Sequence, residues 1–496
     1  MAVEKLNQEI SVIEVHDNEN KHLQQNFNLF STCAFQISLI CSALAIGAYL
    51  NTVIGEGGSP FFIYGFILTA FFNLIICFSL AELASVYPHS SAQIHWTYVL
   101  ASDNYKRLLS FITGILSCAG WIFACLSSTY VATVLLFALI ELYQDFIPKT
   151  FHYYLVYTGI FLSGFILNAF AVQILPICTK FVAGIVNIAT LFIIITLLVK
   201  APKQSSSFVF KEIVNDSGWS SNGVVFFLGL LPSIASITLF DGAVHMTDEI
   251  IQPERNIPLV MVISNSFSAI IAFFAAIVYM FCVKNVDNLT TPVGGQPFVQ
   301  LMYDSFDNDA LTILGVIFLI ISFIGSSYLY YCSTSRLVWS FANSNPLPFS
   351  KKLGSINKKF KSPIWALGFV TILCLILGCI MFGSSSILNA VLGSCMVCIN
   401  LSYLIPLTCL LIKTKCSFYR FDSYFNLGKF GMPMNIASVI WVCFIMVWLN
   451  FPLVNPVDST NMNYACVVLG ITFLFTIGLW FLYGRKHYEH NIDLKH

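Results

Sequence analysis

The sequence predicts an all-α membrane protein with twelve transmembrane helices. Of its 496 residues, 57% are apolar and only 10% are charged, and the mean hydropathy is +0.80. A soluble globular protein carries about 25% charged residues, so this composition excludes a water-soluble protein. Lys and Arg total 24, as do Asp and Glu, so no net positive charge favours nucleic-acid binding. The remaining class is a polytopic helical bundle in a lipid bilayer.

Twelve apolar runs are each long enough to cross a bilayer, which takes about 20 residues. They form one transmembrane domain over 31–483, between polar tails at 1–30 and 484–496. Residues 1–26 have no apolar core, so we expect the first run to be an uncleaved anchor. The predicted spans are 31–53, 60–86, 108–140, 153–172, 176–199, 223–249, 258–283, 309–336, 363–382, 385–411, 433–450 and 463–483.

The distribution of basic residues predicts that both tails lie in the cytoplasm. With that orientation, only five of the 24 basic residues fall in external loops, as the positive-inside rule requires. Glycosylation sequons at Asn215 and Asn288 also fall in predicted external loops. The five external residues are Lys149, Lys200, Lys203, Lys211 and Lys284.

Two spans contain polar residues that interrupt the apolar pattern. In the first span these are Ser38, Cys41 and Ser42, and in the sixth they are Asp241 and Gly242. The two spans are the first members of two five-helix halves, and paired interruptions there indicate a transporter binding site. Packing of small residues explains the first interruption equally well.

Asp241 is the stronger signal, because a carboxylate within a membrane is costly. Three roles are open for it: ligand for a cationic substrate group, proton acceptor, or cap of a broken helix end. Trp121 in the third span suits an aromatic wall for an amine or plain packing. Lys180 lies at the start of the fifth span. Its charge could replace a bound sodium ion, or its side chain could snorkel to the membrane interface, which is the interpretation that we favour.

Five charged residues near the predicted cytoplasmic ends are candidates for a gate or a structural ion-pair network. We expect no metal site, because His95 and His245 show no metal-ligand spacing and the sixteen cysteines lie mostly in apolar runs. Residues 89–100 are too short and polar to span, so we predict an interfacial helix. The five charged candidates are Glu82, Asp248, Glu249, Arg255 and Arg336.

Four segments resemble a known family in order and spacing. They are SLAELASVYP at 79–88, DGAVHMTDEI at 241–250 with PERNIP at 253–258, SRLVWSFA at 335–342, and NMNY at 461–464. These segments resemble parts of the fungal choline, GABA and amino-acid permeases. In order, they match the end of helix 2, then helix 6 with the loop that follows it, then the end of helix 8 and the start of helix 12. These permeases belong to the amino acid–polyamine–organocation superfamily.

The resemblance implies a LeuT-type fold, with two inverted five-helix repeats plus two helices, and secondary transport by alternating access. Two departures from the family pattern bear on the substrate and the loop. Ser91 and Ala92 precede Gln93 where family members often have two glycines. Ala43 and Ala235 stand where choline-type members tend to have bulky aromatic residues, which weakens an aromatic cage for a quaternary amine.

We therefore expect a proton-coupled importer of a small amine-bearing solute in a fungal plasma membrane, without a cofactor. Its partners are then the solute, protons and lipid. Choline transport, and a nutrient sensor that keeps the fold without transporting, are the alternatives. An enzyme is disfavoured because no Walker motif, nucleophile elbow or HExxH motif is present. The expected substrate-binding residues are Ser38, Cys41, Ser42, Trp121, Phe240 and Asp241.

Overall fold

The computed structural model describes residues 23, 25–50, 57–383, 385–416, 421–459 and 461–490. Nearly all of these residues are helical or in turns, and within these ranges pairing of extended chain is limited to two isolated β-bridges. Residues 1–22 of the predicted N-terminal tail and 491–496 of the predicted C-terminal tail lie outside the described residues.

The prediction of an all-α bundle with twelve spans is confirmed. Eleven helices in the described part of the chain are long and apolar enough to cross a bilayer, and the sixth span is built from shorter pieces. The twelve spans are α2 (Leu29–Ile40) with α3 (Ser42–Gly47), α5 (Gly58–Val86), α7 (Lys106–Tyr143), α8 (Thr150–Phe170), α9 (Leu175–Lys200), α11 (Asn222–Leu228) with α12 (Leu231–Ile237) and η2 (Val244–Glu249), α13 (Pro253–Phe281), α16 (Asp309–Ala342), α18 (Ile364–Gly378), α19 (Ser385–Thr414), α20 (Gly431–Trp448) and α21 (Ala465–Leu479).

Short helices connect or extend the spans. They are α6 (Gln93–Leu100), η1 (Val172–Ile174), α10 (Ser206–Phe210), α14 (Asp287–Thr290), η3 (Val293–Gly295), α15 (Pro297–Phe306), α17 (Ser350–Leu353), η4 (Cys379–Phe382), η5 (Gly428–Phe430), η6 (Trp480–Gly484) and α22 (Arg485–His487).

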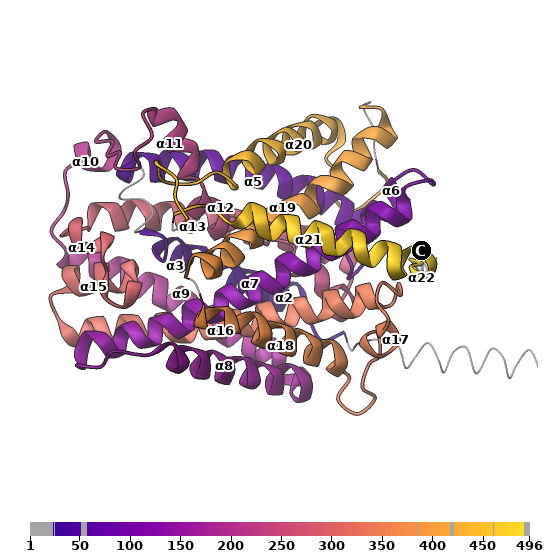
Figure 1. Cartoon of the computed structure of the whole chain (residues 1–496), viewed down its shortest axis with the longest axis horizontal. Coiled ribbons are helices and arrows are strands. Elements are labelled where there is room, and N and C mark those ends of the chain that lie inside the picture. The colour runs from indigo at the N-terminus through magenta and orange to yellow at the C-terminus, as the bar shows by residue number, and fades with distance from the viewer. Residues whose placement is uncertain are drawn as a thin grey trace, which may run out of the picture.

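The long helices lie side by side along the longest axis of the molecule (Figure 1). Corresponding spans of the two halves pack against each other: α5 against α13, and α7 against α16. The two broken spans lie among these helices, because α2 packs against α9, α13 and α16, and η2 packs against α13 and α16. This arrangement places both helix breaks in the interior of the bundle.

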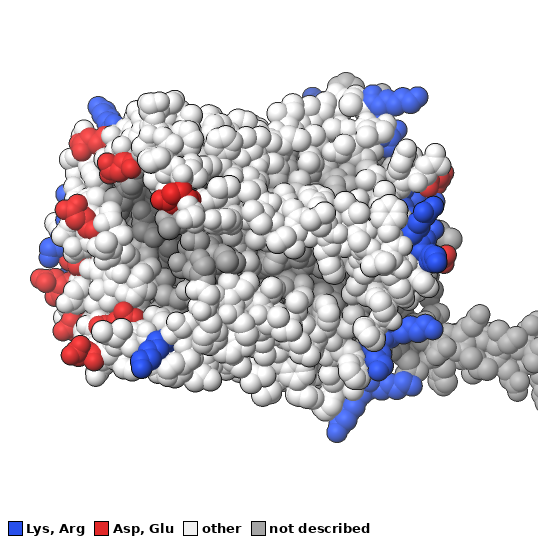
Figure 2. Space-filling model, in the orientation of Figure 1, with Lys and Arg blue, Asp and Glu red and all other residues white. Residues whose placement is uncertain are grey.

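Charged side chains gather at the two ends of the molecule and leave an uncharged belt between them (Figure 2). Basic residues dominate the end that carries α17 and α22, and acidic residues dominate the end that carries α10, α14 and α15. The belt exposes large apolar side chains, among them Ile166, Phe181 and Leu474. An apolar belt between charged ends is the surface that a bilayer-spanning protein needs.

The short helix predicted within residues 89–100 is present as α6, but it is not exposed as a helix on the bilayer surface would be. It packs against α7 and α19, and Trp96 is fully buried. Its polar side chains find partners inside the protein, such as Thr113 for Thr97. The segment is therefore part of the core and brings Gln93 to the centre of the bundle.

Candidate functional site

The first span is interrupted at Cys41, between α2 and α3. Cys41 has left-handed backbone angles, φ 39° and ψ 44°. Neighbouring helices supply donors to the carbonyl groups on either side: the Ser326 hydroxyl donates to Ser38 O at 2.5 Å, and the Tyr279 hydroxyl to Ala43 O at 2.9 Å. Irregular backbone is tolerated at membrane depth only where protein or a cavity satisfies it, and here protein does so.

The sixth span is interrupted between α12 and η2, at residues 238–243. Leu239 in this stretch has φ 68°. The side chain of Gln36, on α2, bridges the break: its Nε2 donates to Leu239 O at 2.9 Å, and its Oε1 accepts from the Ala243 N–H at 2.8 Å. Gln36 thus ties the two broken spans together. Sequence reasoning missed it, although a glutamine within the apolar first span was a visible signal.

Asp241 lies at this break and is fully buried. Gln93 Nε2 donates to its Oδ2 at 2.6 Å, and the Tyr403 hydroxyl donates to its Oδ1 at 2.5 Å. Trp121 Nε1 lies 3.4 Å from Oδ2, and His245 Nε2 lies 3.3 Å from it. Four side chains from α6, α7, η2 and α19 therefore converge on one carboxylate, and those of Gln93, Tyr403 and Trp121 donate hydrogen bonds to it.

His245 is held in a defined orientation beside Asp241. Its Nδ1 lies 3.0 Å from the carbonyl oxygen of Ser90, which can only accept a hydrogen bond, so Nδ1 carries a hydrogen. The edge of its ring meets Trp121, with centroids 5.1 Å apart and planes at 90°. In the neutral imidazole, Nε2 therefore presents a lone pair toward the carboxylate.

Two aromatic side chains that contact the carboxylate, Trp121 and Tyr403, pack against further rings. Phe240 stacks on Tyr403 with centroids 5.2 Å apart, and Trp121 lies 6.0 Å from Tyr330. Gly242 permits the close approach of α2 and α7, because a Cβ there would lie 2.8 Å from a methyl group of Leu39 and 3.2 Å from the Trp121 ring. Tyr403 and Tyr330 were missed from the sequence, since tyrosines in helices are common and only the fold brings these two together.

The predicted residues of the first span differ in what their side chains offer. Ser38 is occupied, because its hydroxyl donates to Ala34 O at 2.6 Å within α2. Cys41 is buried at the break. The Ser42 hydroxyl is also buried and has no hydrogen-bond partner among the described residues.

Of the gate candidates, the structure brings Glu249 and Arg336 together. Arg336 Nε donates to Glu249 Oε1 at 2.8 Å, and both side chains are buried. Glu82 instead accepts from the backbone N–H of Leu427 at 2.8 Å, and Arg255 lies over the ring of Tyr424.

Two charged candidates remain: Asp248, the fifth of the gate candidates, and Lys180, the candidate for a charged site in place of sodium. Asp248 is half-buried in η2. Lys180 is exposed on α9, in agreement with a snorkelling side chain.

Comparison with known proteins decides the family. The family model described as "Amino acid permease" matches residues 27–473, which include both helix breaks and every residue around Asp241. The chain belongs to the amino acid permease family. The resemblance found in the sequence motifs is thereby confirmed.

Relatives of this permease differ in what they carry. It is 30% identical to a choline transporter of Saccharomyces cerevisiae, over 94% of this chain and 83% of that protein. It is 26% identical to amino-acid permease 2 of Neurospora crassa, over 94% and 86% of the two chains. It is also 26% identical to a 7-keto 8-aminopelargonic acid transporter of S. cerevisiae, over 90% of each chain. The permease is thus a multi-pass membrane transport protein.

Proposed function

We propose that the permease imports a small amine-bearing solute, such as an amino acid, GABA or a related compound, by alternating access. The observation that carries the proposal is the buried carboxylate of Asp241 at a helix break, enclosed by Trp121, Phe240 and Tyr403. An ammonium group donates hydrogen bonds to a carboxylate and is also attracted to the faces of aromatic rings. One site thus offers both interactions that an organic cation needs when it leaves water.

The amine is proposed to bind by exchanging partners at Asp241. Gln93 and Trp121 donate neutral hydrogen bonds to Oδ2, and a charged ammonium replaces them with a stronger, charge-assisted bond. The carboxylate or hydroxyl end of the solute is proposed to lie toward the break of the first span, where the Ser42 hydroxyl has no partner among the described residues. Transport then follows from the movement of the two broken spans, which Gln36 links.

Proton coupling is proposed to occur at the pair of His245 and Asp241. Their facing atoms, Nε2 and Oδ2, lie 3.3 Å apart, and a proton between them makes a charge-assisted bond. Gaining or losing that proton changes the net charge of the site by one unit. A substrate ammonium at Asp241 competes for the same oxygen, so proton and solute binding are coupled.

The basic end of the molecule is proposed to face the cytoplasm, and the host membrane is proposed to be a fungal plasma membrane. The basic α17 and α22 lie at one end and the acidic α14 and α15 at the other, as the positive-inside rule expects. Both tails are then cytoplasmic, and the sequons at Asn215 and Asn288 are external.

Choline is the second candidate substrate, and the rings around Asp241 favour it. Tyr403 and Tyr330 add two aromatic rings to Trp121 and Phe240, so the alanines at 43 and 235 do not by themselves remove an aromatic cage. A quaternary ammonium donates no hydrogen bond and depends on such rings, each worth about 2 kcal/mol when desolvated. The relative named as a choline transporter agrees with this candidate.

Uptake by purified protein in liposomes tests both candidates. Labelled GABA, amino acids, 7-keto 8-aminopelargonic acid and choline are offered with and without an inward proton gradient, with a protonophore as control. We expect a primary amine to accumulate only with the gradient and to be displaced less effectively by choline than by other primary amines. Stronger displacement by choline identifies the second candidate. Binding without uptake of any solute contradicts transport and identifies a sensor.

A pair of variants separates the ring of Tyr403 from its hydroxyl. Tyr403→Phe keeps the aromatic face and removes the bond to Asp241, whereas Tyr403→Leu removes both. If choline is the substrate, its affinity falls roughly thirtyfold more in the leucine variant, from one cation–π contact. If a primary amine is the substrate, the two variants differ less.

A further inference from the structure

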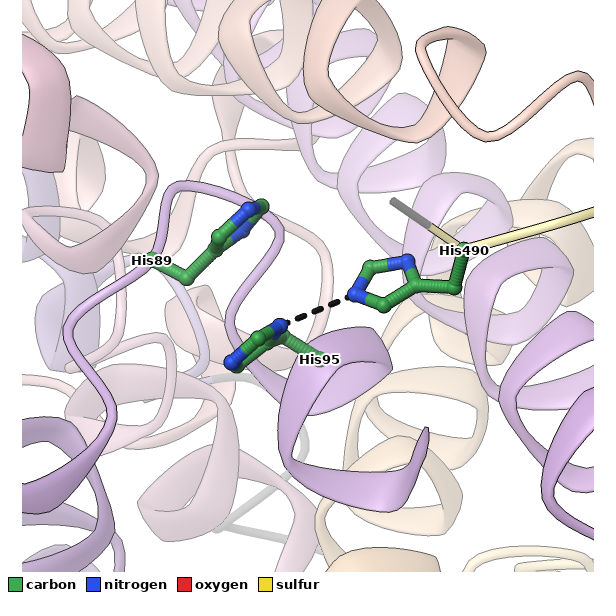
Figure 3. Close-up of side chains that lie close together, drawn as sticks. All are labelled: His89, His95 and His490. Carbon is green, nitrogen blue, oxygen red and sulfur yellow. Dashed lines mark hydrogen bonds between the residues drawn. The ribbon is translucent and has the colours of Figure 1, made fainter. Parts of the chain in front are cut away.

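Three histidines lie together (Figure 3). His89 precedes α6, His95 lies on α6, and His490 follows α22 near the other end of the chain. One ring nitrogen from each lies within 4.8 Å of the others, and His95 Nδ1 is 2.9 Å from His490 Nε2. The sequence shows no metal-ligand spacing here because 395 positions separate His95 from His490.

A serine side chain holds one of the rings by its other nitrogen. Ser344 Oγ lies 2.9 Å from Nδ1 of His490, whose Nε2 faces His95. Such an outer contact fixes the orientation of a ligating histidine in metal sites. Two of the rings are buried and that of His89 is half-buried, which provides a path for an ion from solvent.

Neutral imidazoles are the form that binds metal, because a neutral imidazole has a free lone pair, whereas an imidazolium has none. The two basic residues that begin α7 have other partners: Lys106 lies 2.8 Å from Asp103, and Arg107 donates to the Tyr488 carbonyl.

We propose that His89, His95 and His490 bind one divalent transition-metal ion of the Zn²⁺ class. Three imidazole ligands and one open position suit Zn²⁺, whose bonds to nitrogen are about 2.0–2.1 Å long. An ion between His95 and His490 replaces their hydrogen bond and needs only a small separation of the two nitrogens. His89 supplies the third ligand.

One ring must turn for the ion to bind. The rings of His89 and His95 are stacked, with centroids 4.5 Å apart and planes at 4°, so their lone pairs do not meet in the metal-free arrangement. Rotation of His89 about χ2, a soft torsion, gives up the two contacts of its Nδ1 with Ser91, 3.0 Å to the N–H and 2.7 Å to Oγ. The half-buried position of His89 leaves room for this movement.

The ion clamps the C-terminal segment to the core of the permease. This segment is already docked: Tyr488 is buried, its hydroxyl lies 2.9 Å from Ser110 Oγ on α7, and the Glu489 N–H donates to Ser344 O at 3.0 Å. A metal ion bound by both His490 and α6 adds a further link between the segment and the core. The segment can then detach only if His490 leaves the ion. α6 also carries Gln93, the partner of Asp241, so the clamp reaches an element of the proposed transport site.

Metal titration of the purified protein tests the proposal. The protein is isolated without a histidine tag, stripped with chelator, and titrated with Zn²⁺ by calorimetry and with Co²⁺ by absorption. We expect one ion per chain, with the intense visible bands of four-coordinate Co²⁺. His95→Ala and His490→Ala are each expected to weaken binding by more than the 10–100-fold that loss of an outer partner causes, and Ser344→Ala by about that amount.

His487→Ala is the matched control, because His487 is exposed on the same segment and its ring contacts Tyr483 instead. It is expected to bind Zn²⁺ as the unaltered protein does. Zn²⁺ is also expected to slow tryptic cleavage after the exposed Arg485 and Lys486, but not in His490→Ala.

Each outcome decides the question, provided that the stripped variants melt at the wild-type temperature. Loss of the ion in His95→Ala and His490→Ala, but not in His487→Ala, supports the site. Absence of stoichiometric binding, or equal binding by wild type and His490→Ala, overturns it and leaves only a hydrogen-bonded histidine cluster. Because no readout involves uptake, failure here is distinct from failure of the proposed transport function.

Discussion

Glu249→Gln should destabilise the permease by breaking a buried ion pair. The carboxylate lies 2.8 Å from Nε of Arg336, and the two side chains are 1% and 0% exposed. In the variant the guanidinium keeps its contact with Ser335 Oγ at 3.2 Å but has no counter-charge within the pair. Removing one partner of a buried pair costs about 3–5 kcal/mol, because the remaining charge stays desolvated.

The expected decrease in melting temperature follows from this free-energy cost and from the entropy of unfolding, which grows with chain length. With an entropy of unfolding of about 2.1 cal/mol/K per residue, 496 residues lose about 1 °C per kcal/mol, so we expect a decrease of about 3–5 °C. A thiol-reactive dye suits the assay, because all sixteen cysteines are free and most of them are buried until the protein unfolds.

Arg255→Gln is the control for the loss of a charge, since Arg255 is exposed and lies over the Tyr424 ring. It should melt within about 0.5 °C of wild type. The double variant Glu249→Gln, Arg336→Gln should recover part of the loss, because no lone charge remains buried. If Glu249→Gln melts at the wild-type temperature, the pair does not stabilise the junction between η2 and α16, and the reasoning fails.

Three further predictions concern backbone conformation, packing and topology. Ala92 has φ 47°, a conformation that glycine adopts more easily than alanine, so Ala92→Gly should raise the free energy of unfolding by about 1 kcal/mol in the same melting assay. Ala81→Gly, inside α5, should lower it. Equal melting temperatures of the two variants contradict strain at Ala92. Gly242→Ala should reduce uptake at normal surface expression, because the new methyl would lie 2.8 Å from a methyl group of Leu39 and 3.2 Å from both the Trp121 ring and Gln36 Oε1. Gly470→Ala, with open space around it, should leave uptake unchanged. Unimpaired uptake by Gly242→Ala refutes the close packing at the break. Single cysteines introduced at 342–362 should be labelled by an impermeant reagent only from the cytoplasm, and those at 200–222 only from outside, so labelling of 342–362 in intact cells reverses the proposed orientation.

The spans could be predicted from the sequence because the bilayer sets their length and requires a continuous apolar run. The break at Asp241 was visible for the same reason, since a carboxylate in such a run needs an explanation. The interruption at Cys41 was visible only as a weak pattern, and its left-handed conformation comes from the structure.

The partners of Asp241 could not be predicted in the same way. Gln93 and Tyr403 lie 148 and 162 positions away in the chain, and only tertiary packing brings them to the carboxylate. His245 is four positions from Asp241, so its proximity was visible in the sequence, but its orientation toward the carboxylate was not. The misjudged exposure of α6 has the same origin. Polar residues in a short helix indicate a surface position unless they have buried partners, and here Asp241 accepts a hydrogen bond from Gln93 Nε2.

The histidine cluster shows a different limit of the sequence. Spacing rules detect metal ligands that are close in the chain, whereas His490 reaches His95 only because the C-terminal segment folds back onto α7 and α16. Of the five gate candidates, the pairing of Glu249 with Arg336 likewise required the three-dimensional structure, since any of the acids was a suitable partner on charge alone.

The charge of Asp241 is the central claim of the account, and uptake by Asp241→Asn in liposomes tests it most directly. Asparagine keeps the shape and removes the charge, whereas Asp103→Asn removes an exposed carboxylate paired with Lys106 and serves as the control. At equal amounts of folded protein, we predict that Asp241→Asn loses gradient-driven uptake and its dependence on external pH, while Asp103→Asn retains both. Unchanged uptake with an unchanged pH profile in Asp241→Asn would show that the buried charge binds neither the amine nor the proton.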